Sequence, residues 1–441
     1  MRKDLVQNLV ELVALLIGCL VGYLLYTRMS WRVVDTHFQN SPFHIVPLLL
    51  AYLVLARMAI RSRTRLGMAS FAVLNLVGFL KLSTQLTGAP QIAMVTQQIL
   101  YIVIVCCHYF LVRRYAGSLG KIALIPIIMP VIVLIVIKLL SLLTWPRTSL
   151  AGAIINMTFM SYLAFRLSYL ALEVRNRIIP MPIFAEHFSY AFFFPIMPVG
   201  PISRYSLFHR SLKNPQSVPL ATCATRILVG LTKYFFLSNI INSVSFDGLL
   251  FDGHPHGIFD LFISSIAYYL YLYLNFSGFC DIVIGLSGIL GIAIEENFDR
   301  PFHARCVKDF WNHWHITLST YLRDILFAPL SKWLAGGLGP GQVQHAVGIT
   351  LFVVFLVIGM WHGLSMNFIL FGVMHGGAVA CNHYYNLMLK KYLGLEHYKA
   401  YMRNRIIQAV ATTLTFLYVS ISFLFFANSM EKIMTLVEVI R

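Results

Sequence analysis

The chain has 441 residues, of which 58% are hydrophobic and only 12% are charged, and its mean hydropathy is +0.74. The charged share is about half that of an average globular protein, which excludes a soluble domain. Lys and Arg (34) outnumber Asp and Glu (17), but these basic residues stand in short loops between apolar runs. There they mark the cytoplasmic side of a membrane protein and contact anionic lipid, so we do not expect nucleic acid as a partner.

The first half of the chain is dominated by long apolar runs, and a run of roughly 18 or more such residues is long enough to span a bilayer. Six runs predict spans near residues 9–27, 44–60, 68–84, 92–112, 122–144 and 150–172. Basic residues follow every second run, which places the N-terminus in the cytoplasm, although Arg28 and Arg32 lie on the opposite side of this scheme. We expect no cleavable signal, because the first run can span and no small-residue cleavage site follows it.

The pattern changes near residue 180. Pro195, Pro198 and Pro201 exclude a regular helix, so residues 180–215 are expected to form a re-entrant or interfacial element. This element ends in a basic stretch from Arg204 to Lys213.

The remaining chain predicts further spans separated by polar segments. These spans lie near 223–243, 346–361, 364–381 and 406–427, with an aromatic helix around 268–273 and a short amphipathic tail. The polar and small residues of 275–281 are expected to interrupt a hydrophobic region. The result is an all-α polytopic membrane protein of about 11 spans. We expect one integral membrane domain, with N-terminal helices in 1–150, a core in 155–380 and C-terminal helices in 381–441.

Two short stretches carry the chemistry. His315 lies within a stretch from Asp309 to Asp324, and His362 stands between Trp361 and Gly363. An ionisable side chain at membrane depth is unfavourable unless it has a function, so both histidines are candidate site residues. Imidazole titrates near neutral pH and can take a proton from a hydroxyl, which makes His362 a candidate general base.

If residues 309–324 form one helix, Trp311 and His315 share a face, with Asn312 and Ser319 on neighbouring faces. His313 then points elsewhere. Asp309 and Arg323 are expected to form structural pairs, with Lys308 and Asp324 as partners. Gly363 removes side-chain bulk beside the His362 ring.

Other interpretations remain open. His362 is alternatively a histidine bonded to a neighbouring helix. A zinc site is conceivable, but the histidine spacing matches no metal motif, so no metal is expected. The seven cysteines are expected to be reduced packing residues. A secondary transporter of a small acid and a non-catalytic scaffold of an envelope assembly complex are the alternative functions. A transporter is disfavoured because most carboxylates fall in turns and we see no internal repeat.

Six motifs in a fixed order resemble the membrane-bound O-acyltransferase family (MBOAT). They are Phe194-Pro195 with Gly200-Pro201-Ile-Ser-Arg204, Gly230-Leu-Thr-Lys233, Phe276-Ser-Gly-Phe-Cys-Asp281, Glu296-Asn-Phe-Asp-Arg-Pro301, Phe310 to Ser319 with Arg323-Asp324, and Gly359 to Gly363 with His375-Gly376. The resemblance covers about residues 155–380 closely and the first 150 residues by hydropathy alone.

Within that family the chain is most similar to the bacterial branch that modifies cell-envelope polymers, with D-alanyl and alginate O-acetyl types. Ser161 to Arg166 and Lys308 to Asn312 lean towards the D-alanyl type. Asn275 stands where the family commonly has Asp, and His313 where it commonly has Arg.

The resemblance implies a ring of helices around a central tunnel, where an acyl thioester enters from the cytoplasm and its acyl group leaves on an extracytoplasmic hydroxyl. It maps the two catalytic roles onto His362, as general base, and His315, which polarises the thioester carbonyl or holds the acceptor. Asn312 or Ser319 would support His315.

The same resemblance implies the surroundings of this site and its partners. Tunnel-lining candidates are Trp311, Asn312, Trp314, Ser319, Trp361 and Gly363. Donor-phosphate candidates are Arg204, Arg210, Lys213 and Lys233, with ordinary topology as the alternative for these basic residues. The donor is expected on a phosphopantetheine carrier protein or coenzyme A, with no bound cofactor. The acceptor is a polymer or an accessory transferase, and the location is a bacterial plasma membrane.

Overall fold

The computed structural model describes residues 45–87, 91–115, 117–118, 120–141, 157, 159–250 and 256–439, and the predicted span at 9–27 lies outside these. Within the described part every regular element is helical, and an isolated bridge joins Phe298 to Trp314. The chain forms two compact units. The first comprises Met1–Ile227 with Val283–Ile294, and the second Leu228–Ile282 with Glu295–Arg441.

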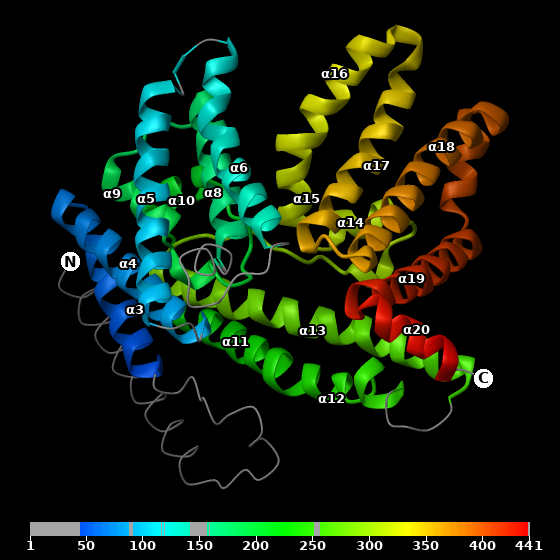
Figure 1. Cartoon of the computed structure of the whole chain (residues 1–441), viewed down its shortest axis with the longest axis horizontal. Helices are drawn as coiled ribbons and strands as arrows, with labels where there is room; N and C mark the ends of the chain where they lie inside the picture. The colour runs from blue at the N-terminus through cyan, green and yellow to red at the C-terminus, as the bar shows by residue number, and fades with distance from the viewer. Residues whose placement is uncertain are drawn as a thin grey trace, which may run out of the picture. The chain divides into compact units, whose positions relative to one another are not determined.

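The first unit is built from long N-terminal helices and short ones that follow them (Figure 1). Its helices are α3 (Ile45–Ser62), α4 (Arg65–Thr87), α5 (Gln91–Tyr115), η2 (Gly120–Leu124), α6 (Ile125–Leu140), α8 (Met160–Arg175), α9 (Phe184–Ala191), η3 (Phe194–Ile196), α10 (Tyr205–Lys213) and most of α11 (Leu220–Leu231). The region 180–215 is thus broken into short helices, as its prolines predict.

The core of this unit is aromatic. The Phe79 ring centroid lies 5.0 Å from those of Tyr101 and Phe192 and 5.6 Å from that of Phe159. All four side chains are at most 1% exposed. Aromatic pairs at these separations add to the free energy of burying their area, so this cluster fixes α4 and α5 against the segments that follow.

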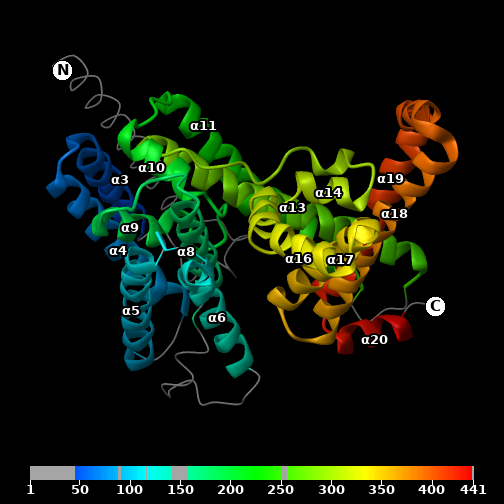
Figure 2. The same ribbon diagram turned by 90° about the horizontal axis from the view of Figure 1, so that it is seen from above.

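The second unit contains the C-terminal helices. They are η4 (Thr232–Leu237), α12 (Ser238–Asn242), η5 (Phe246–Leu250), α13 (Ile258–Leu290, shared with the first unit), η6 (Pro301–His303), α14 (Val307–His313), α15 (Ile316–Leu322), η7 (Arg323–Phe327), α16 (Ala328–Leu338), η8 (Pro340–Gln342), α17 (Val343–His362), α18 (Met366–Arg403), α19 (Arg405–Ala427) and α20 (Met430–Val439). Helices α16, α17 and α18 run side by side in both views (Figures 1 and 2).

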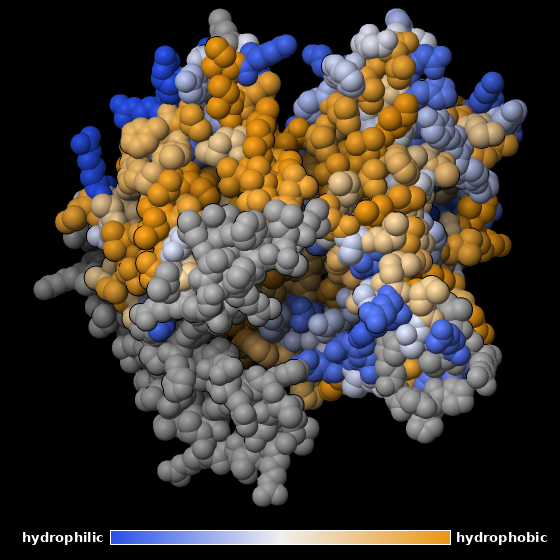
Figure 3. Space-filling model, in the orientation of Figure 1, coloured by the Kyte–Doolittle hydropathy of each residue, from blue (hydrophilic) through white to orange (hydrophobic). Residues whose placement is uncertain are grey.

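Seven helical stretches among the described residues are long and apolar enough to cross a membrane. They are Arg65–Ser83, Ala93–Tyr115, Gly120–Leu140, Leu220–Leu250, Ile258–Leu290, Pro340–His362 and Arg405–Ala427. The exterior agrees, because hydrophobic side chains cover α5 and α6 while hydrophilic ones gather where these two helices join (Figure 3). The chain is therefore a multi-pass helical membrane protein, as predicted, while the count of about 11 spans stays a prediction.

One expectation about the spans was wrong. Residues 275–281 do not interrupt the hydrophobic region, because α13 runs through them as a helix of 33 residues. Gly278 serves close packing instead. A Cβ on Gly278 would lie 2.8 Å from the carbonyl oxygen of Gly230, so the absence of a side chain lets the two backbones approach.

Candidate active site

The stretch that carries His315 is not one helix. Helix α14 ends at His313 and α15 begins at Ile316. His315 stands between them with φ 44° and ψ 51°, a left-handed conformation that is unfavourable for a residue with a side chain. The predicted helical face shared by Trp311 and His315 is therefore wrong. The break arises because Trp314 pairs with Phe298 across a bridge, which pulls the chain out of helical geometry.

Asn297 holds the start of α15. Its backbone oxygen accepts from the N–H of Ile316 at 3.0 Å. Its side-chain Oδ1 accepts from the N–H and the hydroxyl of Thr317, at 3.2 and 2.6 Å. The N–H groups of a first helical turn have no partner within the helix, so Asn297 caps α15 from a different segment.

The same Oδ1 of Asn297 lies 3.3 Å from Nδ1 of His315. The Thr317 N–H can only donate, so the Asn297 atom that faces it is the oxygen rather than the amide nitrogen. Nδ1 of His315 must then carry the proton in the neutral ring. Nε2 is left with a free lone pair, and His315 can accept a hydrogen bond there but cannot donate one.

His315 is only 5% exposed and lies outside the seven candidate spans. Burial, and to a smaller extent the charge on His362, lower its pKa to about 3. Both causes disfavour the imidazolium. A positive charge on His362 thus disfavours a second charge on His315, which remains neutral.

His362 ends α17 in an aromatic setting. Its ring centroid lies 4.4 Å from that of Trp361, 4.7 Å from that of Phe426 and 6.1 Å from that of Phe368. A Cβ on Gly363 would meet the Phe368 ring at 2.4 Å. The missing side chain at Gly363 thus makes room for the Phe368 ring.

Glycines also fix α17 against α18. A Cβ on Gly359 would lie 2.3 Å from the backbone oxygen of Phe368, and one on Gly372 would lie 2.9 Å from that of Phe355. A Cβ on Gly376 would lie 2.8 Å from the backbone oxygen of Phe352. Small residues at this spacing let membrane helices pack closely, so the position of His362 is set by backbone contact.

A hydrogen-bonded chain ties α14 to α18 and α19. The indole nitrogen of Trp311 donates to Nδ1 of His375 at 3.1 Å, and Nε2 of His375 lies 2.8 Å from Oγ of Ser422. An indole N–H only donates, so Nε2 of His375 carries the proton and donates to Ser422. Ser422 in turn donates to the backbone oxygen of Val419 at 2.7 Å.

The other predicted tunnel residues differ in their surroundings. Trp314 is 4% exposed and stacks on Phe310, with ring centroids 5.4 Å apart. Ser319 donates to the backbone oxygen of Trp311 at 2.9 Å. Asn312 is exposed. Ser319 thus has a structural hydrogen bond, and Trp311 and Trp314 are packed among neighbouring side chains.

The charged residues of this stretch form local pairs. Arg323 bonds Asp324 at 3.0 Å, as expected. Asp309 accepts from the N–H of Arg305 at 3.0 Å and lies 3.6 Å from Nδ1 of His313. These contacts hold the ends of α14 in place.

Lys233, a donor-phosphate candidate, has a carboxylate partner. Its ammonium lies 2.7 Å from Oδ2 of Asp281, and both side chains are mostly shielded, at 25% and 16% exposure. The pair lies one turn beyond the close contact of Gly230 with Gly278. Two of the sequence motifs thus form one helix-crossing element in the second unit.

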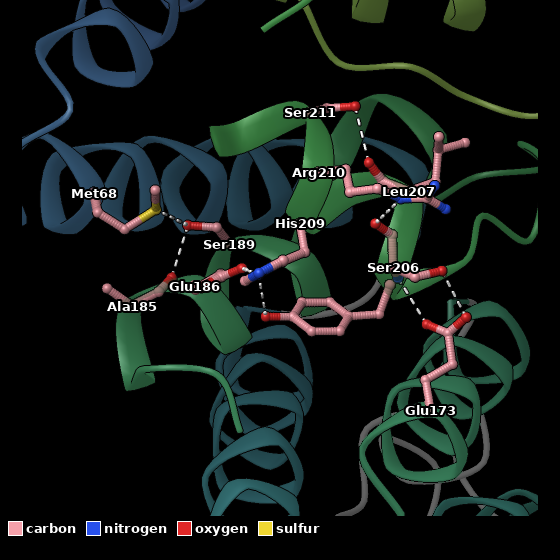
Figure 4. Close-up of polar contacts among 11 residues, drawn as sticks. Met68, Glu173, Ala185, Glu186, Ser189, Ser206, Leu207, His209, Arg210 and Ser211 are labelled. Atoms are coloured by element: carbon pink, nitrogen blue, oxygen red, sulfur yellow. Dashed lines mark hydrogen bonds and ion pairs between the residues drawn. The ribbon is translucent and has the colours of Figure 1, made fainter. Parts of the chain in front are cut away.

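Arg204, Arg210 and Lys213 belong to the first unit, at the start and along α10. Figure 4 shows how α10 is anchored. Glu173 accepts from the N–H of Ser206 at 2.7 Å and from its hydroxyl at 2.8 Å, which caps the first turn.

Farther along α10, His209 contacts the carboxylate of Glu186. Arg210 donates to the backbone oxygen of Ser206 at 3.2 Å and is exposed, as is Lys213. Arg204 lies over the Tyr169 ring at 5.3 Å. The anchored helix therefore presents Arg210 and Lys213 outward.

No group of three or more His, Cys, Asp or Glu side chains suited to hold a metal ion occurs within the described ranges. The site is instead an asparagine-clamped histidine near a second histidine at a glycine-packed helix end. Sequence reasoning missed Asn297 and His375 as positioning residues, although both stand inside motifs that carried the family resemblance.

Comparison with known proteins identifies the family of the chain. The family model described as MBOAT, membrane-bound O-acyltransferase family, matches residues 70–428. The chain is 29% identical over 281 residues to a teichoic acid D-alanyltransferase of Bacillus subtilis (strain 168), covering 62% of this chain and 69% of that protein.

The names of two further relatives specify other polymers. The chain is 29% identical over 257 residues to a peptidoglycan O-acetyltransferase of Helicobacter pylori, covering 56% of this chain and 45% of the relative. It is 31% identical over 201 residues to a probable alginate O-acetylase of Pseudomonas syringae, covering 45% of this chain and 37% of the relative. The chain belongs to the membrane-bound O-acyltransferase family and is an acyltransferase.

Proposed function

We propose that this protein moves an acyl group, D-alanyl or acetyl, from a cytoplasmic thioester to a hydroxyl on the outer side of a bacterial plasma membrane. The donor thioester is carried by a phosphopantetheine carrier protein or coenzyme A. The acceptor is a cell-envelope polymer or an accessory transferase. The relatives' names, which specify teichoic acid, peptidoglycan and alginate, support this class of acceptor.

The observation that carries this proposal is the pair of histidines. His315 is clamped by Asn297 with its Nε2 lone pair available, and its pKa responds to the charge on His362. Two imidazoles that interact but do not both become charged can divide the work, one taking a proton while the other stays a neutral acceptor.

In this mechanism His362 is the general base. It takes the proton of the reacting hydroxyl as the oxygen attacks the acyl carbon. The carbon–sulfur bond then breaks, and the proton passes from His362 to the leaving thiolate, so atoms and charge balance. Holding the reactants in position lowers the barrier further.

His315 holds the acceptor. Of the two roles that the sequence left open, polarising the thioester carbonyl needs a donor, and the Asn297 clamp leaves Nε2 without a proton. A second hydroxyl of a polyhydroxylated acceptor donates to Nε2, which orients the reacting hydroxyl towards His362. The left-handed backbone at His315 supports this assignment, since strained residues gather at functional sites.

The donor's phosphate is assigned to Arg204, Arg210 and Lys213, which lie on or beside the anchored helix α10. Lys233 is left out of this set because Asp281 already balances its charge. We also propose that a tunnel joins the donor to the acceptor.

The test replaces His315 and His362 separately with Ala in cells and measures acyl groups on envelope polymers by mass spectrometry. Membrane insertion and amount of protein are checked in the same cells. We expect an inserted protein and loss of acylation in the His362→Ala variant, with a smaller loss for His315→Ala. The mass of the lost group tells D-alanyl from acetyl.

The same variants separate the alternatives. A transporter of a small acid would keep substrate uptake without His362, and a scaffold would keep polymer acylation with both histidines replaced. Either result would overturn the proposal.

A further inference from the structure

A cavity lies among residues of the first unit. Its volume is about 260 Å³, and it is lined by Arg57, Arg61, Arg63, Pro215, Gln216, Ser217, Val218, Gly288, Ile289, Leu290 and Gly291. These residues come from the end of α3, the loop before α11 and the end of α13. Three lining residues are arginines, and none of the eleven is an acid.

The walls of this arginine pocket are held by hydrogen bonds to backbone oxygens. Arg57 donates from Nη1 to the backbone oxygen of Ile289 at 3.0 Å. The N–H of Gln216 donates to the backbone oxygen of Gly291 at 3.0 Å. Gly291 has φ 80° and approaches Pro215 so closely that a Cβ would lie 2.9 Å from it. The pocket is thus a built feature of the fold.

An apolar groove begins at the same turn. Its volume is about 640 Å³, and it is lined by Leu55, Met58, Ala59, Ser62, Thr64, Leu66, Gly67, Ala69, Ser70, Val73 and Leu74. Successive residues where α3 meets α4 line the two cavities in turn. Arg61 and Arg63 line the pocket, and Ser62 and Thr64 line the groove. The pocket and the groove thus adjoin at this turn.

The turn also lies at a membrane boundary. The first candidate span begins at Arg65, directly after it. Groove residues Leu55, Met58, Leu66 and Val73 are 50–77% exposed within the described part of the chain, and all four are apolar. The basic residues of this turn mark the cytoplasmic side, where the leaflet carries anionic lipids.

We propose that the arginine pocket binds the phosphodiester of an anionic phospholipid whose acyl chain lies in the groove between α3 and α4. The planar guanidinium matches phosphate oxygens with paired N–H donors, and three such groups without an acid select an anion. The phosphodiester of a phosphopantetheine donor has the same charge, but it would leave the groove unexplained. This inference is independent of the acyl-transfer mechanism.

The test is native mass spectrometry of the full-length protein extracted in mild detergent with phosphatidylglycerol. The R61Q/R63Q variant is compared with the wild type and with Arg65→Gln, a basic residue of the same turn that does not line the pocket. We expect R61Q/R63Q to retain about 30-fold less phosphatidylglycerol, since the two surface arginines together contribute about 2 kcal/mol to such binding. Retention of neutral phosphatidylethanolamine should not change.

A second arm identifies the source of the phosphate. The KM for the thioester donor is measured for the same variants in vesicles of fixed composition. An unchanged KM together with the loss of phosphatidylglycerol supports the lipid site. A raised KM with unchanged lipid retention would assign the pocket to the donor, and retention equal to that of Arg65→Gln would show that no lipid site exists. Arg63→Gln alone, at an exposed position, provides the comparison if the double variant does not fold.

Discussion

Asn297 presents one side-chain oxygen to both Nδ1 of His315, at 3.3 Å, and the backbone N–H of Thr317, at 3.2 Å. The backbone N–H of Thr317 fixes the orientation of the Asn297 amide. The oxygen of that amide fixes the tautomer of the His315 imidazole. Asn297 is fully buried, so water does not compete for these bonds. Asn297 thus decides which ring nitrogen of His315 carries the proton.

The pH dependence of an Asn297→Asp variant tests whether Asn297 controls the protonation of His315. A carboxylate beside Nδ1 favours the imidazolium and raises the pKa of His315, which burial and the His362 charge now hold low. Because His315 must be neutral to accept a hydrogen bond, activity is present above its pKa and is lost as pH falls through it. We expect the acid limb of the kcat/KM profile to move to higher pH.

Asn297→Leu and Thr317→Ser complete the comparison. Asn297→Leu removes the clamp and should lower kcat roughly 100-fold, the usual effect of misplacing a reacting group by about 1 Å. Thr317→Ser keeps both donors and should behave like wild type. A purely structural asparagine would reduce the amount of folded protein in Asn297→Asp without moving the acid limb.

Gly372→Ala and Gly377→Ala form a matched pair on α18. A methyl group on Gly372 would meet the Phe355 backbone oxygen at 2.9 Å, whereas nothing lies within 4 Å of the same position on Gly377. We expect Gly372→Ala to destabilise the protein by about 1–3 kcal/mol and to lower activity by shifting His362. Gly377→Ala should be neutral or slightly stabilising. Thermal unfolding in detergent gives the ranking, and equal melting temperatures would contradict it.

The bond from Trp311 to His375 is tested by a double-mutant cycle. Trp311→Phe leaves a buried acceptor on His375 without its donor, which should reduce the free energy of unfolding by about 1–3 kcal/mol. His375→Leu removes the acceptor itself. If the bond matters, the double variant loses less than the sum of the two single losses. Additive losses would show that the two side chains act separately.

The Lys233–Asp281 pair predicts a different pattern. Lys233→Met or Asp281→Asn leaves one charge uncompensated, so each should destabilise the protein, by less than the roughly 3–5 kcal/mol of a fully buried pair since both groups are partly exposed. The double variant should recover part of the loss. The donor KM should stay constant throughout. A KM that falls in Asp281→Asn and rises in Lys233→Met would instead return Lys233 to the donor site.

Much of the fold follows from the sequence because membrane helices leave strong signals. The span predicted at 406–427 appears as α19 (Arg405–Ala427), and the prolines near 195 predicted the short helices around them. Local composition decides both, since lipid demands long apolar helices and proline lacks the N–H a helix needs.

The site was less predictable because it depends on contacts between distant segments. The break at His315 arises from the bridge between Phe298 and Trp314, which helical periodicity does not report. The polar and small residues before Asp281 suggested an interruption, but they accommodate the backbone of Gly230. The importance of Asn297 depends on where one amide oxygen points, and a residue name cannot reveal that.

The most direct test of the account uses purified protein in vesicles, with a labelled acyl thioester on the side of the basic turns and a hydroxyl acceptor on the other. Wild type and His362→Ala are compared after equal insertion has been shown. If His362 is the general base, we expect labelled acceptor with the wild type and only background labelling with His362→Ala. Transfer by His362→Ala at the wild-type rate would contradict it.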